Sequence, residues 1–166
     1  MAHAGRFLTT HVGSLPREDD LIEIMFAKED GLPLDMAAVD ARIAEAVQFV
    51  VDRQAEAGLD IINDGEQSKP SYATYIKDRL DGFGGTGNSF AFQDIEDYPS
   101  TKDRVFSDPG RKHRKTPACN APITVKDMTA VDRDAAALNA ALAKHTGKQA
   151  FMSAASPGVT ALFFRN

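Results

Sequence analysis

The sequence contains one cysteine, Cys119, among its 166 residues. A single thiol excludes an internal disulfide and makes a reducing compartment the default, so we expect a cytoplasmic protein. It also excludes a zinc site built on two or more thiolates from one copy of the chain. No apolar run reaches the roughly 18 residues of a membrane span, and the first residues lack the apolar core of a secretory signal. No membrane partner is therefore expected.

Positive charge is also in short supply. The chain has 19 Lys and Arg against 24 Asp and Glu, a net charge of −5 with histidine neutral. Proteins that mainly bind a phosphate backbone are usually basic, so no nucleic-acid partner is expected. With 43% hydrophobic and 26% charged residues, the chain has the composition and length of one soluble globular domain over residues 1–166.

Helix and strand patterns alternate along the chain. An apolar stripe predicts the longest helix over residues 36–57, with Asp35 as its cap and Gly58 at its end. The helix is followed at once by a short β-type run, which is the order typical of β/α units with a parallel sheet. Strands are expected at 6–14, 59–63, 121–125 and 150–154, and further helices at 18–30, 71–80 and 132–145.

This order predicts an α/β fold, a partial (β/α)8 TIM barrel. We count about four β/α units, the last of them incomplete, whereas a closed eight-stranded barrel typically needs about 250 residues. The chain therefore resembles a cut through a larger fold. Residues 82–117, rich in glycine and proline, interrupt the alternation and are expected to form an inserted loop or hairpin region.

Polar residues gather where three of the predicted strands end, at 11–17, 64–67 and 156–160. In parallel α/β folds ligands bind at that edge of the sheet. Backbone N–H groups around Val12, Gly13 and Ser14 suit a carboxylate, because glycine allows close approach and a helix follows. Glu66, assisted by Asp64, suits an ammonium group. Together the loops would hold an amino-acid zwitterion. The candidate substrate-binding residues are His11, Val12, Gly13, Ser14, Arg17, Asp64 and Glu66.

A purely structural interpretation stays open for each of these residues. Gly13 and Ser14 are also typical of a strand-to-helix turn, and Asp64 with Gly65 is a common turn dipeptide. His11 alone is typical of a buried or capping side chain. What favours a binding role is that three polar clusters are expected at one edge of the sheet.

Three other features carry weaker signals. Residues 82–87 match the dinucleotide pattern G-x-G-x-x-G, but a predicted helix precedes them where the pattern needs a strand, which favours a loop. The basic run 111–115 suits either a polyanion or, more simply, solvent. Cys119 has no histidine beside it in sequence to lower its pKa, which is typical of an unreactive buried thiol.

Four stretches of the chain resemble the cobalamin-independent methionine synthase family, in its catalytic C-terminal barrel and its shorter single-barrel relatives. They read THVGSLPR at 10–17, GLDIINDGE at 58–66, CNAPI at 119–123 and SAASPGVT at 153–160. The stretches follow the family's order and span nearly the whole chain. They reach about the first half of the family's barrel.

The resemblance implies a zinc-dependent transfer of a methyl group from 5-methyltetrahydrofolate to the thiol of homocysteine, giving methionine. Zinc would lower the pKa of the thiol and present a nucleophile at neutral pH. By the same resemblance, the turn Val12-Gly13-Ser14 contacts the carboxylate of the amino acid and Glu66 contacts its ammonium. Cys119 would lie near the folate.

The chain departs from the family in its metal ligands. The family takes them from later strands, as a His and a Cys close together followed by a Glu and a second Cys, and no His-x-Cys occurs here. We therefore expect the N-terminal half of such a barrel, inactive alone. Two alternatives stay open: a non-catalytic half-barrel that self-associates through exposed sheet edges or pairs with a partner chain, and an alkyl transfer to a different thiol.

Overall fold

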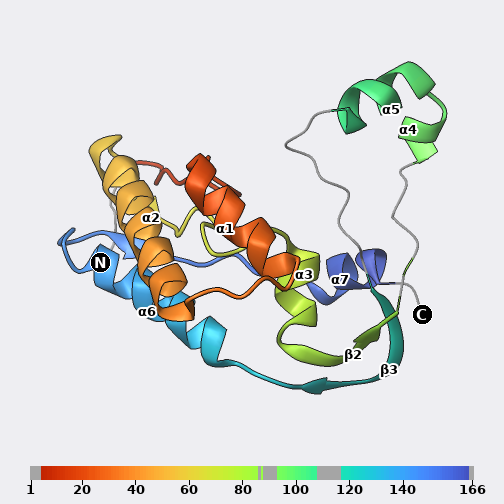
Figure 1. The fold of residues 1–166 in the computed structure, drawn as a ribbon. Helices are drawn as coiled ribbons and strands as arrows, with labels where there is room; N and C mark the ends of the chain where they lie inside the picture. Colours follow the sequence, from red (N-terminus) through yellow and green to blue (C-terminus); the bar gives the residue numbers. More distant parts are fainter. Residues whose placement is uncertain (1–4, 86, 88–92, 108–116, 165–166) are drawn as a thin grey trace. The chain divides into compact units, whose positions relative to one another are not determined.

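The computed structural model describes residues 5–85, 87, 93–107 and 117–164 (Figure 1). Contacts divide the chain into a first unit, drawn from residues 1–71 and 128–154, and a second unit, drawn from residues 72–127 and 155–166. The assignment of residues 1–166 to one half-barrel domain stays a prediction. In chain order the elements are α1 (Asp19–Glu29), α2 (Met36–Glu56), β1 (Ile61–Ile62), α3 (Tyr72–Lys77), β2 (Leu80–Gly84), α4 (Gln93–Glu96), α5 (Pro99–Phe106), β3 (Ala118–Val125), α6 (Thr129–Leu142), β4 (Gln149–Ala150) and α7 (Pro157–Phe163).

The first unit is built on a short parallel ladder. Strands β1 and β4 pair in parallel, with Ile61 opposite Gln149, and Thr10 forms a parallel bridge to the other side of Ile61. Three segments that are far apart in sequence therefore run side by side in one direction, with helices between them along the chain. The fold is mixed α/β with small sheets, and no closed barrel forms among the described residues; the partial barrel stays a prediction.

Helix α2 forms where its sequence predicts. The carboxylate of Asp35 accepts hydrogen bonds from the amides of Ala37 at 3.0 Å and Ala38 at 3.4 Å, so the cap is confirmed. At the other end Gly58 takes φ 82°, a left-handed conformation that glycine adopts at little cost, and the chain turns into β1.

The core of the first unit lies between α2, α6 and the ladder. Figure 1 shows α2 and α6 lying alongside each other. The predicted apolar stripe of α2 supplies two side chains that are at most 2% exposed, and β1 supplies one that is fully buried. The buried cluster consists of Val47, Val51, Ile62, Leu138 and Ala141. A second cluster, which packs α1 on α2, consists of Leu21, Met25 and Ala46.

The second unit contains an antiparallel hairpin. Strand β2 pairs with β3, with Leu80 opposite Val125 and Gly84 opposite Ala118. The parallel strand predicted at 121–125 is therefore wrong in direction and partner. The two paired strands flank most of the region expected to be inserted at 82–117, and the number of parallel segments among the described residues is three rather than four.

Gly82 explains this hairpin. It has φ 100°, and a Cβ at this position would lie 2.8 Å from the carbonyl oxygens of Ala121 and Pro122. Only glycine permits so close an approach of the two strands at the irregularity between Asp81 and Phe83. The pattern at 82–87 thus opens within a strand, while the basic run 111–115 falls outside the described residues. Within the described ranges, no helix combines the length and apolar character of a membrane span.

Asp60 ties the N-terminal segment to the start of β1. Its carboxylate accepts hydrogen bonds from the Thr9 amide at 2.9 Å and the Thr9 hydroxyl at 3.1 Å, and it pairs with the guanidinium of Arg6 at 2.7 Å. The Arg6 hydrogen bond, followed by that of the Thr9 amide, lowers the pKa of Asp60 well below its ordinary value of 3.8.

We expect this attachment to be lost in acid. Because the folded carboxyl has the lower pKa, the native state binds fewer protons than the unfolded state, so the stabilisation is complete above about pH 4 and is lost as the pH falls further. In an NMR titration from about pH 6 into strong acid, the Thr9 amide of the wild type should begin to shift only well below about pH 4, and the Thr9 amide of Asp60→Asn should show no such titration. Asp19→Asn, an exposed acid on α1, serves as the control and should titrate like the wild type. A Thr9 titration that survives in Asp60→Asn would contradict the assignment.

Candidate functional site

Two loops meet at the carboxyl end of the first two parallel segments. One loop, residues 11–17, follows the bridge at Thr10, and the other, residues 63–69, follows β1. The amide of Leu15 donates to the carbonyl of Gly65 at 3.0 Å, and the side-chain amide of Gln67 donates to the carbonyl of Leu15 at 3.2 Å. The sequence argument predicted that these loops would converge. Residues 156–160, the third expected cluster, belong to the second unit, so their part in this site stays a prediction.

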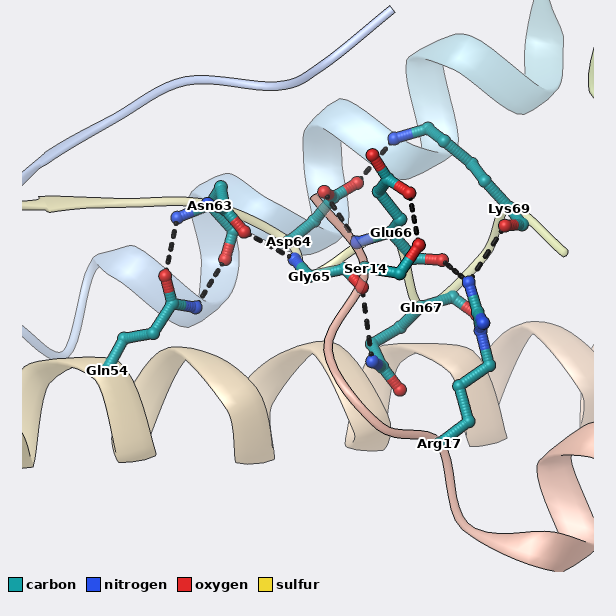
Figure 2. A network of polar contacts seen from close by, with 9 residues as sticks. All are labelled: Ser14, Arg17, Gln54, Asn63, Asp64, Gly65, Glu66, Gln67 and Lys69. Carbon is teal, nitrogen blue, oxygen red and sulfur yellow. Dashed lines mark hydrogen bonds and ion pairs between the residues drawn. The ribbon is translucent and has the colours of Figure 1, made fainter. Parts of the chain in front are cut away.

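The hydroxyl of Ser14 donates a hydrogen bond to the carboxylate of Glu66, as Figure 2 shows. Glu66 is 8% exposed whereas Ser14 is exposed, so the pair spans the boundary between the interior and the surface. Glu66 has φ 56° and is the one residue other than glycine with positive φ in the described part of the chain. This left-handed conformation costs an L-residue about 1–2 kcal/mol, which the surrounding contacts must offset.

Hydrogen bonds from within the second loop hold this turn. A carboxylate oxygen of Asp64 accepts the Glu66 N–H at 3.0 Å, and the side-chain oxygen of Asn63 accepts the Gly65 N–H at 2.8 Å. The amide of Lys69 donates to the carbonyl of Glu66 at 2.9 Å. Asp and Asn side chains commonly stabilise turns in this way, by bonding the backbone two residues ahead.

Arg17 belongs to the first loop and binds the backbone of the second loop through hydrogen bonds. Its guanidinium donates to the carbonyl oxygens of Glu66 and Lys69, the latter at 2.8 Å, and its Nε donates to the carbonyl of Gln67 at 3.4 Å. A planar guanidinium can bond several carbonyls at once, which a lysine cannot do in the same geometry. Arg17 was predicted to bind substrate; the structure shows it joining the two loops, and substrate contact stays a prediction.

Lys69 forms a buried ion pair with Asp64. Nζ lies 2.5 Å from a carboxylate oxygen, and both side chains are 3% exposed (Figure 2). Sequence reasoning did not select Lys69, since a lysine in a polar loop is normally solvated. The only available signal was its position five residues after Asp64, within the polar run that follows a buried strand.

Gln54 connects this region to helix α2. Its side-chain amide donates to the carbonyl of Asn63 at 2.8 Å and accepts the Asn63 N–H at 3.1 Å, replacing a strand neighbour at the end of β1. The side chain of Asn63 in turn donates to the carbonyl of His11. Sequence reasoning also missed Gln54, which is 4% exposed in the last turn of helix α2.

The predicted residues at the start of the first loop leave the backbone approachable. Val12 is 70% exposed, and Gly13 has φ 98° with nothing within 4 Å of the position that a Cβ would occupy. The ring of His11 is hydrogen-bonded to the carbonyl of Gly13 at 3.0 Å, which fits the structural interpretation of this histidine. Space at Gly13 suits the approach of a ligand carboxylate to the backbone.

Cys119 lies in the second unit, on strand β3. It borders an apolar cavity of about 520 Å³, and its Sγ is 3.9 Å from the carbonyl oxygen of Ala121. The rings of Phe83 and Phe164, in the wall of the same cavity, have centroids 4.4 Å apart. The predicted folate contact of Cys119 stays a prediction.

The described residues do not fit a zinc centre. No three His, Cys, Asp or Glu side chains within the described ranges gather in an arrangement that could hold a metal ion. The ring of His11 bonds the Gly13 carbonyl and that of His145 bonds Asp52 at 2.6 Å, so these two histidines have structural partners. A zinc site needs three or four such donors at about 2.0–2.3 Å.

Residues 7–109 match the sequence profile of the family described as "Cobalamin-independent synthase, Catalytic domain". The chain is also similar to curated proteins named 5-methyltetrahydropteroyltriglutamate–homocysteine methyltransferase. It is 31% identical to the protein of Haemophilus influenzae and 32% identical to that of Pasteurella multocida, each over 78 residues, which are 47% of this chain and 10% of the relative. It is 27% identical to that of Mycolicibacterium paratuberculosis over 111 residues, 65% of this chain and 14% of the relative. The matched part is thus about a tenth to a seventh of these relatives' length.

Proposed function

Because this chain belongs to the family of cobalamin-independent synthase catalytic domains, we propose that it contributes to a methyl transfer from 5-methyltetrahydrofolate to the thiol of homocysteine, giving methionine. Its own part is to hold the amino-acid end of homocysteine. The observation that carries the proposal is the Ser14–Glu66 hydrogen bond, which joins the two loops at the carboxyl end of neighbouring parallel segments.

Each end of the zwitterion has a chemical match. The buried Glu66 carboxylate supplies the negative charge for the ammonium, and the Ser14 hydroxyl orients that carboxylate. The open backbone at Gly13 supplies N–H donors for the substrate carboxylate. Held by both charged groups, homocysteine would present its thiol at the end of the side chain. Arg17 serves by keeping the two loops at a fixed separation.

The second substrate, the methyl donor, is 5-methyltetrahydrofolate. A folate carries flat ring systems, and the cavity beside Cys119 is lined by apolar and aromatic side chains, which suits a ring. The names of the relatives supply the identity of the methyl donor. Zinc has no matching donor set in the described residues, so the role proposed for them is confined to binding and orienting the amino acid.

The proposal predicts a large loss of affinity in Glu66→Gln. The substitution preserves the size of the side chain and removes its charge, and a hydrogen bond to a charged group contributes about 1.5–3 kcal/mol. We therefore expect L-homocysteine to bind the variant at least about tenfold more weakly in isothermal titration calorimetry. L-methionine, which shares the amino-acid end, should show the same loss.

The matched control is Glu45→Gln, an exposed glutamate on α2. Equal affinities in Glu66→Gln and Glu45→Gln would remove Glu66 from the site. The same titrations separate the acceptors: a thiol without an amino-acid end has no use for Glu66. A coenzyme-type thiol that binds the wild type tightly, and Glu66→Gln equally tightly, would favour alkyl transfer to a different acceptor.

A further inference from the structure

Both carboxylate oxygens of Asp64 are bonded inside the protein. Oδ1 accepts the Glu66 N–H at 3.0 Å and Oδ2 lies 2.5 Å from Nζ of Lys69, with the whole residue 2% exposed. Figure 2 shows the ion pair beside the Glu66 side chain. Asp64 is therefore placed to hold the turn, whereas a ligand contact would need an accessible oxygen.

We propose that Asp64 and Lys69 are positioning residues that keep the Glu66 carboxylate aimed at Ser14. Lys69 fixes the orientation of the Asp64 carboxylate, and Asp64 fixes the Glu66 N–H. These two contacts hold Glu66 in the left-handed conformation from which its side chain reaches the first loop. The predicted effect on amino-acid affinity rests on the proposed function, whereas the positioning of Glu66 does not.

The choice of a charged pair at this place supports a positioning role. Buried ion pairs stabilise a fold little more than apolar side chains of the same size, and their best-attested use is to select one conformation. The competing conformation here is the right-handed one that an L-residue prefers. The main-chain bond from Lys69 to the Glu66 carbonyl does not depend on the side chain, whereas the bond from Nζ to Asp64 does.

The test begins without ligand, on the 166-residue chain. The double variant Asp64→Asn/Lys69→Met removes both buried charges and retains an oxygen that can accept the Glu66 N–H. We expect the Glu66 amide to exchange with solvent at least tenfold faster, and its intraresidue amide-to-Hα NOE, strong in a left-handed residue, to weaken. Lys28→Met, on the last turn of α1, is the control and should leave both signals unchanged.

A merely structural pair would lower the melting temperature and leave Glu66 as it is, so wild-type Glu66 signals in the double variant overturn the proposal. If the double variant does not fold, Asp64→Glu is measured instead, because it retains both charges and displaces the carboxylate by one methylene. Changed Glu66 signals there support the proposal, and unchanged signals overturn it.

The ligand experiment follows on the same proteins. L-homocysteine should bind the double variant about tenfold more weakly than the wild type, in the direction expected of Glu66→Gln. An unchanged affinity alongside changed Glu66 signals would overturn the link from positioning to binding. Failure of L-homocysteine to bind the wild type would contradict the proposed function instead, and the ligand-free measurements would still decide whether Asp64 and Lys69 position Glu66.

Discussion

Replacing Lys69 alone with methionine is expected to lower the free energy of unfolding by about 3–5 kcal/mol. The Asp64 carboxylate is 3% exposed and would stay buried without its ammonium partner. Methionine is close to lysine in length and shape, so the loss comes from the unpaired carboxylate and not from a cavity. The free energy of unfolding of natural domains is about 5–15 kcal/mol in total, so this loss would be a large fraction of it. Urea denaturation followed by circular dichroism measures the change.

Two comparisons isolate the cause. Lys28→Met removes an exposed lysine from α1, and surface substitutions of this kind usually change stability by less than about 0.5 kcal/mol. Asp64→Asn/Lys69→Met should recover most of the loss, because it leaves no buried carboxylate unpaired. Equal losses in Lys69→Met and Lys28→Met would show that the pair contributes no more than an ordinary surface charge.

Helices α1, α2, α3 and α6 were predicted because their signals are local, whereas α4, α5 and α7 were not predicted. The longest was predicted at 36–57 and is observed at Met36–Glu56, since an apolar stripe, the cap at Asp35 and the stop at Gly58 all act within one segment. The strands were harder. A run predicted at 59–63 is paired only at Ile61–Ile62, because the extent of a ladder depends on partners far away in the sequence.

The direction of β3 shows the same limit. Residues 121–125 form a short β-type run, and nothing in such a run tells a parallel partner from an antiparallel one. The deciding contact is the close approach at Gly82, about forty residues earlier. That glycine was interpreted as part of a loop, which is the usual meaning of a glycine-rich stretch, although it lies within β2.

At the site, the sequence predicted that the loops at 11–17 and 63–69 would meet, but not how they are held. Ser14 and Glu66 were placed together by the rule that binding loops follow parallel strands, and the two side chains are hydrogen-bonded. The contributions of Lys69 and Gln54 could not be predicted, because each depends on burial that only the folded chain defines. The family resemblance is confirmed by the match over residues 7–109.

Gln54 is the clearest case of such a hidden contribution. It belongs to the helix that carries the core stripe, yet its amide replaces a strand neighbour for both backbone groups of Asn63, at 2.8 and 3.1 Å. The side chain of Asn63 then bonds the Gly65 amide at 2.8 Å and the His11 carbonyl. One helical glutamine therefore supports the point from which the loops at 11–17 and 63–69 both depart.

Gln54→Leu should accordingly destabilise the chain by about 2–4 kcal/mol, although leucine fits a buried helical position well. The N–H and C=O of Asn63 would lose these partners in a site that water does not reach, and each such loss costs about 1–3 kcal/mol. Gln48→Leu, on the same helix with a half-exposed glutamine bonded to Asp52, is the matched control and should cost well under half as much. Urea denaturation gives the two losses, and faster exchange of the Asn63 amide in Gln54→Leu locates the effect. If Gln54→Leu were as stable as Gln48→Leu and the Asn63 amide still exchanged slowly, the end of β1 would be held without Gln54. The support of both loops would then have to come from the turn at 63–66.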